Sequence, residues 1–340
     1  MKHYLVTGGS GFLGSALVRR LVQLGHRVRV FDNNSRGDLR RLAGVEGSFE
    51  FVRGDIRDSD AVARAVQGVD SVCHLAFVNG TEFFYAVPEL VLEVGVKGIM
   101  NVVDACLKHR VPELILASSS EVYQEAPVVP TDESAPFSIP DPFNPRLSYA
   151  AGKQISEIVA LNYGRTLFER VVVIRPHNVY GPDMGWEHVI PQFALRMKEA
   201  CRRQDNPVPF PIQGNGRQTR AFIFVDDFID GLMLAIQKGV HRNIYHIGTT
   251  EEVAIQDLAQ MVGDCYSRGV AIQPSPAAEG GTPRRCPDIR KLAALGFQPR
   301  CSLRQGLNLT VPWYDANAHL GPNPPQPEPE ENPTCHTPKN

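Results

Sequence analysis

The chain has 340 residues, of which 43% are hydrophobic and 21% charged, and its formal net charge is −2. This length and composition indicate a two-lobed globular protein with a large core. The balanced charge gives no electrostatic reason to bind nucleic acid or a membrane surface. The seven cysteines form no Cys-x-x-Cys pair, so we expect reduced thiols and no metal site in a cytoplasmic protein. The sequence has no apolar run of the roughly 20 residues that span a bilayer and no apolar signal-peptide region.

The first 175 residues alternate short apolar runs with amphipathic segments. Strands are predicted at residues 4–7, 27–32, 51–53, 71–75, 113–117 and 171–175. Helices are predicted between them at residues 12–24, 60–66 and 88–108. This order predicts an α/β fold with a Rossmann-type, doubly wound parallel sheet covered by helices.

The pattern loosens after residue 175, where proline and glycine punctuate residues 181–217. Residues 221–225 are again predicted as a strand, followed by helices at 228–238 and 255–266. We therefore predict one domain from residues 1–175 and 218–250, and a smaller α/β lobe for the substrate from residues 176–217 and 251–313. The composition then becomes polar and rich in proline, so residues 314–340 are expected to form a disordered tail.

A glycine-rich turn joins the first strand to the first helix. Gly8, Gly11 and Gly14 have the spacing G-x-x-G-x-x-G. In dinucleotide sites, one such glycine makes the tight turn, one lets the backbone approach the pyrophosphate, and one lets helix and strand pack closely. The helix N-terminus then faces the phosphates with free N–H groups and partial positive charge. An ordinary strand–helix turn is the alternative, but the predicted elements on both sides favour a dinucleotide site.

Asp32, at the end of the second strand, indicates which dinucleotide is bound. A carboxylate here accepts hydrogen bonds from a ribose 2′-hydroxyl and repels a 2′-phosphate, which favours NAD over NADP. Arg36 is the feature that would suit a 2′-phosphate instead. Asp55, which follows the third strand, is expected near the adenine, or else serves only to cap its loop.

Tyr149 and Lys153 form a Tyr-x-x-x-Lys pair on one face of a helix. We expect the lysine charge to lower the pKa of the phenol from about 10, which would make Tyr149 a usable base. Ser119 and Ser120, after the fifth strand, are expected to bond a substrate hydroxyl or to cap the strand end. Glu121 lies at the carboxyl edge of the sheet, where α/β folds bind ligands.

Together these residues resemble the extended short-chain dehydrogenase/reductase family and, within it, the NAD-dependent nucleotide-sugar epimerases and dehydratases. The resemblance runs from about residue 4 to about residue 313. Its motifs are residues 7–14, 54–56, 74–76, 118–123, 149–153, 175–182, 213–217, 225–227, 285–289 and 295–297, with Arg220.

The resemblance implies that Tyr149 takes the proton of a sugar C4 hydroxyl while NAD takes the hydride, giving a 4-keto sugar. It further implies a nucleotide-diphosphate-sugar substrate and a homodimer formed through a four-helix contact. The substrate would be bound by Asn178, Val189, Arg220 and Arg285. The cofactor would be bound by Gly8, Gly11, Phe12, Leu13, Gly14, Asp32, Asn33, Ser35, Arg36, Asp55, Ile56, Leu75, Ala76, Tyr149, Lys153 and His177.

The residues around Glu121 favour one reaction within this group. The 4,6-dehydratases carry Thr-Asp-Glu here, whereas Ser120 stands at the middle position, as in the similar Ser-Thr-Ser-Glu-Val-Tyr of UDP-glucuronate decarboxylases. In such enzymes, C4 oxidation gives a β-keto acid that loses carbon dioxide before C4 is reduced again. The chain departs from the family pattern at Gly95, Ile99 and Gln124, and in residues 77–87 and 183–188.

We therefore expect a UDP-glucuronate-decarboxylase-like enzyme, with a 4-epimerase, dehydratase or 4-oxidase as close alternatives. An alternative of a different class is a non-catalytic NAD-binding regulatory or scaffold protein. The intact Tyr149 and Lys153 argue against that alternative, because a binding module has no need for them.

Overall fold

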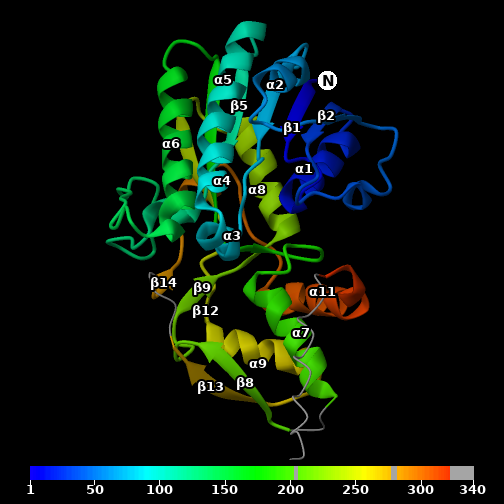
Figure 1. Cartoon of the computed structure of the whole chain (residues 1–340), viewed down its shortest axis with the longest axis vertical. Helices are drawn as coiled ribbons and strands as arrows, with labels where there is room; N and C mark the ends of the chain where they lie inside the picture. Colours follow the sequence, from blue (N-terminus) through cyan, green and yellow to red (C-terminus); the bar gives the residue numbers. More distant parts are fainter. Residues whose placement is uncertain (203–205, 277–281, 322–340) are drawn as a thin grey trace, which may run out of the picture.

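The structure, a computed structural model, describes residues 1–202, 206–276 and 282–321. Its larger part is a seven-stranded sheet in the order β11-β6-β5-β4-β1-β2-β3, with helices packed around it (Figure 1). All neighbouring strands in this sheet run parallel, so the predicted Rossmann-type fold is confirmed. The strands are β1 His3–Thr7, β2 Arg27–Asp32, β3 Glu50–Arg53, β4 Ser71–His74, β5 Glu113–Ala117, β6 Arg170–Pro176 and β11 Asn243–Ile247.

The central strands are apolar because both faces of the sheet are covered. Every residue of β1, β4 and β5 is buried, as expected for a parallel sheet between two helical layers. The helices of this part are α1 Phe12–Gln23, α2 Ser59–Val66, α3 Thr81–Ala86, α4 Pro88–Leu92, α5 Gly98–His109, α6 Ser148–Tyr163 and α8 Val225–Lys238.

A smaller lobe lies below the carboxyl ends of the large sheet in Figure 1. It pairs β13 with β8 and places β9 between β12 and β14. Its elements are α7 Val189–Cys201, β8 Val208–Gln213, β9 Thr219–Ala221, β12 Glu252–Ala254, α9 Ile255–Cys265, β13 Val270–Ser275, β14 Arg284–Arg285 and α11 Leu303–Ala316. Short elements between the two parts are β7 Val179–Tyr180, β10 Ile223–Phe224 and α10 Arg290–Ala293. The exact boundaries predicted for the two domains, after residues 175, 217 and 250, remain a prediction.

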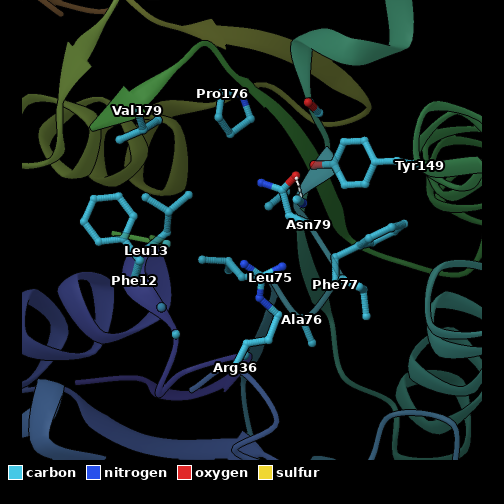
Figure 2. A pocket seen from close by; sticks show the side chains of 18 of the residues that line it. Phe12, Leu13, Arg36, Leu75, Ala76, Phe77, Asn79, Tyr149, Pro176 and Val179 are labelled. Carbon is cyan, nitrogen blue, oxygen red and sulfur yellow. Dashed lines mark hydrogen bonds between the residues drawn. The ribbon is translucent and has the colours of Figure 1, made fainter. Parts of the chain in front are cut away.

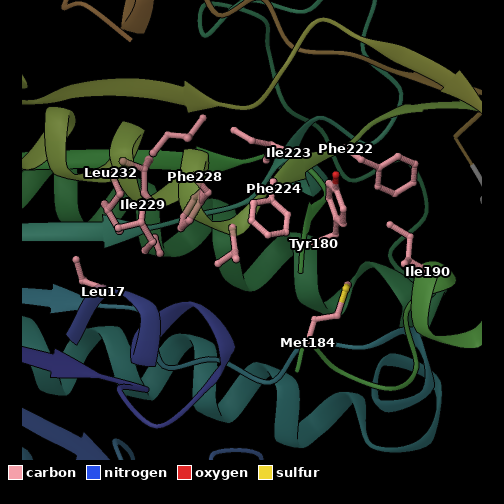
Figure 3. Packing of buried hydrophobic residues seen from close by; sticks show 14 of the residues in the cluster. Leu17, Tyr180, Met184, Ile190, Phe222, Ile223, Phe224, Phe228, Ile229 and Leu232 are labelled. Atoms are coloured by element: carbon pink, nitrogen blue, oxygen red, sulfur yellow. The ribbon is translucent and has the colours of Figure 1, made fainter. Parts of the chain in front are cut away.

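One buried cluster connects the two parts of the molecule. Figure 3 shows Leu17 of α1 facing Ile229 of α8, with Phe224 and Tyr180 continuing the apolar contact toward Ile190 of α7. All five side chains are at most 5% exposed. Continuous packing of this kind holds the lobe against the sheet domain and fixes the space between them.

Two predicted elements differ in the structure. The predicted strand at residues 221–225 is two short strands, β9 and β10, and Val225 already begins α8. The predicted helix at 88–108 consists of α4, a π-helical turn at Glu93–Lys97 and α5. Gly95, inside this turn, lies close to Phe77 and to Gly152 of α6. Single π-helical turns of this kind are frequent at functional sites.

The predicted disordered tail begins too early. Tyr314 is fully buried in α11, and its hydroxyl donates a hydrogen bond of 2.6 Å to the carbonyl oxygen of Met184. Residues Ala318–Leu320 form a further 3-10 turn. The prediction is therefore wrong for residues 314–321, because aromatic packing extends past the last family motif. Residues 322–340 lie outside the described part of the chain.

Candidate active site

A cavity of about 430 Å³ lies at the carboxyl ends of β1, β4 and β5, where the lobe meets the sheet. In Figure 2, Tyr149 and Phe77 lie on one side of it, and Phe12 and Leu13 of α1 on the other. Nearly all of the predicted site residues line this cavity, although the sequence separates them widely. They are Gly8, Gly11, Phe12, Leu13, Gly14, Asp32, Asn33, Ser35, Arg36, Asp55, Ile56, Leu75, Ala76, Ser119, Ser120, Glu121, Tyr149, Lys153, Asn178, Val189 and Arg285.

Two predicted site residues do not line the cavity. His177 is 1% exposed and packs edge-on against His246, with ring centroids 4.7 Å apart. Pro176 and Asn178 line the cavity, whereas His177 between them does not. Direct contact between His177 and the cofactor is therefore not supported. Arg220 does not line the cavity, but its charge helps to lower the pKa of Glu121, which does.

The glycine-rich turn has no room for side chains. A Cβ on Gly14 would lie 2.0 Å from the carbonyl oxygen of Gly8, and a Cβ on Gly8 would lie 2.8 Å from the backbone of Ala76. Gly8 also has a φ of +71°, which favours glycine. Helix α1 has no side-chain cap at Gly11 and no acidic residue in its first turn. Its free N–H groups thus form an electropositive cradle that fits a pyrophosphate.

Asp32 is positioned by backbone groups at the edge of this cradle. Its Oδ2 accepts a hydrogen bond of 3.0 Å from the Ser10 amide, and its Oδ1 accepts one of 2.9 Å from the Asn34 amide. The guanidinium of Arg36 is paired with Glu187. Glu187 offsets the charge of Arg36, and Asp32 places a carboxylate in the same cavity, which fits NAD better than NADP.

Asp55 lies across the same end of the cavity, where Asn33 donates to its Oδ2 at 3.1 Å. Hydrogen bonds from the Arg57 side chain are the main reason that the pKa of Asp55 falls to about 2. Asp55 is therefore an ionised hydrogen-bond acceptor at neutral pH, which agrees with its predicted place near the adenine.

Tyr149 and Lys153 are buried side by side on α6, at 7% and 4% exposed. Burial raises the pKa of the Tyr149 phenol, and the neighbouring Ser119 hydroxyl only partly opposes this. Burial also lowers the pKa of Lys153 to about 7. The expectation that the lysine lowers the tyrosine pKa is therefore wrong for the protein alone. The ammonium lies 5.8 Å from the phenol ring and donates a hydrogen bond of 2.7 Å to the Ala117 carbonyl oxygen.

The serines after β5 have two roles. Ser119 caps the 3-10 turn Ser120–Tyr123 by accepting a hydrogen bond of 3.1 Å from the Glu121 amide. Ser119 thus caps this turn and not the end of the strand, and its hydroxyl lies beside the Tyr149 phenol. Ser120 is 3% exposed and lines the cavity with its neighbours.

Glu121 forms a two-point ion pair with Arg285 across the cavity. Nη1 of the arginine contacts one carboxylate oxygen, and Nη2 donates to the other at 3.2 Å. Burial by itself would raise the pKa of Glu121, but the charge and hydrogen bonds of Arg285 outweigh it and lower that pKa. Arg146 and Arg220 act in the same direction. One ionised carboxylate is thus surrounded by three guanidinium groups.

A buried network that the residue pattern does not predict supports residues 118–123. Arg175 is 1% exposed and donates to both oxygens of Glu157, at 2.8 and 2.6 Å. Ser118 also donates to Glu157, and the same arginine bonds the hydroxyl of Tyr123. The only signal in the sequence is a charged residue in the apolar run of β6, which predicts a buried partner but does not identify it.

A glycine-rich turn, an acidic second strand and a buried Tyr–Lys pair around one cavity define a Rossmann-fold enzyme that uses a nicotinamide dinucleotide. The model of the NAD dependent epimerase/dehydratase family matches residues 4–248. The chain belongs to this family, and it uses NAD as its cofactor.

Relatives and solved structures extend this result. The UDP-N-acetyl-alpha-D-glucosaminuronate decarboxylase of Bacillus cytotoxicus is 30% identical over 92% of this chain and 98% of its own. UDP-glucuronic acid decarboxylase 2 of Arabidopsis thaliana is 32% identical over 90% of this chain and 67% of its own. A dTDP-glucose 4,6-dehydratase from Streptomyces venezuelae, solved with NAD bound, superimposes with a TM-score of 0.83 at 30% identity, covering 94% of this chain and 98% of its own.

The described residues contain no helix long and apolar enough to cross a membrane. Within residues 1–202, 206–276 and 282–321, no three His, Cys, Asp or Glu side chains are grouped so as to hold a metal ion.

Proposed function

We propose that the chain decarboxylates a UDP-linked uronic acid such as UDP-glucuronate through a 4-keto intermediate. The observation that carries this proposal is the ionised Glu121 bound by Arg285 inside the cavity. With Arg146 and Arg220 nearby, the surroundings of this pair have an excess of positive charge. A sugar carboxylate and a diphosphate are both anionic, and guanidinium groups bind such oxygens with paired hydrogen bonds.

The same pair disfavours dehydration. Loss of a sugar hydroxyl as water needs a general acid to protonate the leaving oxygen. Arg285 keeps Glu121 ionised, and Ser120 has no carboxyl group to donate a proton. Loss of carbon dioxide from a carboxylate β to the C4 ketone needs no acid, and the enolate left at C5 takes up a proton from water before C4 is reduced. This contrast favours the decarboxylase over the dehydratase among the alternatives.

The chemistry at C4 is assigned to the residues around Tyr149. We place the sugar C4 hydroxyl between the Tyr149 phenol and the Ser119 hydroxyl, which lie together at the cavity wall. When bound, NAD supplies a hydride acceptor that can return the hydride, and a positive ring charge that favours the phenolate. Tyr149 accepts the hydroxyl proton during oxidation and gives it back on reduction. Lys153 orients the site from beneath, and Asn178, Val189 and Arg285 hold the rest of the nucleotide sugar.

A panel of nucleotide sugars tests this proposal. The purified protein is incubated with UDP-glucuronate, UDP-glucose, UDP-N-acetylglucosamine and dTDP-glucose, and the products are identified by mass and by NMR. We expect loss of carbon dioxide from UDP-glucuronate and no loss of water from the neutral sugars. Unchanged mass with inverted C4 would support an epimerase instead. Retained NAD with no turnover of any sugar would support the non-catalytic alternative.

We also infer that the chain forms a homodimer. Helices α4 and α6 lie side by side at one edge of the molecule (Figure 1). They expose apolar side chains there, with Leu92 at 37%, Ile155 at 38% and Ile158 at 50% exposed. Neighbouring apolar groups on adjacent helices are a feature that a second copy of the chain would bury.

A further inference from the structure

The Phe77 ring occupies a slot that is formed by two glycines. Its tip lies between Gly95, in the π-helical turn, and Gly152 of α6. A Cβ on Gly95 would lie 2.5 Å from Cζ of Phe77, and a Cβ on Gly152 would lie 3.0 Å from the same atom. The departure of Gly95 from the family pattern therefore has a steric reason, because the ring fills the space that a side chain would need.

The same ring contacts both members of the Tyr–Lys pair. The Lys153 ammonium lies 4.0 Å from the Phe77 ring centroid, within the range of a cation–π contact. The Tyr149 ring meets Phe77 edge-on, with centroids 5.1 Å apart and planes at 80°. Figure 2 shows Phe77 directly beside Tyr149 on one wall of the cavity. Phe77 thus connects the slot to the proposed reacting groups.

We infer that Phe77 is a positioning residue that acts through Lys153. The Ala117 carbonyl oxygen takes one N–H of the ammonium at 2.7 Å, and the aromatic face covers another side of it. A lysine ammonium has three donors, so the bond to Ala117 leaves others that a ligand in the cavity can accept, because Lys153 and Tyr149 both line it. The inference rests on the proposed roles of Tyr149 and Lys153, and it adds that the slot of Gly95 and Gly152 sets the ammonium position.

Simple space filling is the competing explanation, because Phe77 also packs against a small apolar cluster. The two explanations differ for Phe77→Leu, which keeps an apolar group at the slot but removes the aromatic face. The test measures kcat, KM for the nucleotide sugar, and the rate of NAD release from the holoenzyme. If the aromatic face positions Lys153, we expect kcat to fall and NAD release to accelerate, each by about tenfold, with KM changed less than twofold.

A second variant tests whether the slot itself is responsible. In the otherwise unchanged enzyme, Gly95→Ala pushes the ring away from Lys153, and we expect a loss of kcat similar to that of Phe77→Leu. In the Phe77→Leu background the same change meets no ring tip, so its additional effect on kcat should be under twofold. Phe168→Leu is the matched control, since Phe168 is buried in a cluster away from the cavity. It should lower the thermal midpoint without changing kcat or NAD release.

Two results would overturn the inference. One is a Phe77→Leu enzyme whose kcat and NAD release both stay within twofold of the original values, since the ring would then only fill space. The other is an equal loss of kcat from Gly95→Ala in both backgrounds. Failure of the proposed function is recognised separately, because the unmodified enzyme would then release no carbon dioxide from UDP-glucuronate, whatever happens at Phe77.

Discussion

At Tyr149, burial favours the neutral phenol, whereas the proposed reaction needs a phenolate that can accept a proton. The phenol lies in an apolar environment, stacked on Phe84 with ring centroids 4.8 Å apart, and burial raises its pKa. A proton acceptor in such a place works only when a bound cation stabilises the phenolate. Tyr149 is therefore neutral in the protein without ligands, and we expect bound cofactor and substrate to lower its pKa.

The Tyr149 hydroxyl is the proposed proton acceptor, so its removal should abolish most of the turnover. Tyr149→Phe removes the proton acceptor and preserves the ring packing, so kcat should fall by at least about 100-fold. Initial rates with UDP-glucuronate measure the effect, and the far-UV circular dichroism spectrum and NAD content should stay unchanged. Full turnover in this variant would exclude the proposed role of Tyr149.

The ion pair of Glu121 and Arg285 predicts a pH effect. Arg285 holds the pKa of Glu121 below the ordinary value of a glutamate. The carboxylate is therefore still ionised at the ordinary pKa, and it is protonated only when the pH falls below its own lowered pKa. Burial opposes this lowering, so loss of the arginine charge should move the pKa of Glu121 upward. In the residual activity of Arg285→Met, the acidic limb of kcat/KM should therefore lie at least about one pH unit higher than in the original enzyme. A limb at the same pH in both enzymes would contradict the assignment.

At the scale of elements, two loops meet across the mouth of the cavity. Residues 33–42 follow β2, and residues 183–188 precede α7. Arg36 pairs with Glu187, while Arg40 and Arg41 contact Asp183 at 2.5 and 3.2 Å. These pairs connect the cofactor side of the cavity to the lobe. In an enzyme that reduces and reoxidises the same NAD, a connection of this kind slows cofactor loss between turnovers.

This connection predicts that Asp183→Asn, which removes the shared partner of two arginines, accelerates NAD release several-fold. The Asp183 side chain is only 15% exposed, so its pairs are screened less than surface pairs. The release rate from the holoenzyme measures the effect. Glu199→Gln serves as control, because it removes only the exposed pair with Arg202 and should leave the rate unchanged. Equal release rates in all three proteins would show that the loops do not retain the cofactor.

At the scale of the whole molecule, we predict that two copies of the chain form a dimer through α4 and α6. Ile158→Arg places a charge in the exposed apolar strip of α4 and α6 that we assign to the dimer contact. Sedimentation should show a dimer for the original chain and a monomer for the variant, since a buried unpaired charge costs several kcal/mol. Lys108→Glu also changes a charge on an exposed helical residue, and it should leave the dimer intact. A monomeric original chain would contradict the inference directly.

The sequence by itself determined the features that depend on neighbours along the chain. The Gly8–Gly14 turn, Asp32 after its strand, and the Tyr149–Lys153 spacing are local patterns with periods of two or 3.6 residues, so the sheet, the cofactor and the reaction family followed from them. Helix ends were less certain: Tyr314 lies in α11 because of contacts that composition does not reveal.

Only the tertiary structure decided which distant residues meet. Glu121 and Arg285 are 164 residues apart in the chain, and Arg36 and Glu187 are 151 apart. Each pair joins a residue that follows a strand of the large sheet to a residue of the lobe, so the pairing depends on how the lobe packs against the sheet, which no local period encodes. Burial likewise sets the protonation of Tyr149 and Lys153, because the cost of charge depends on the groups that fold around it. The sequence therefore identified the cofactor and predicted the reacting groups, while the fold determined the burial and the partners of those groups.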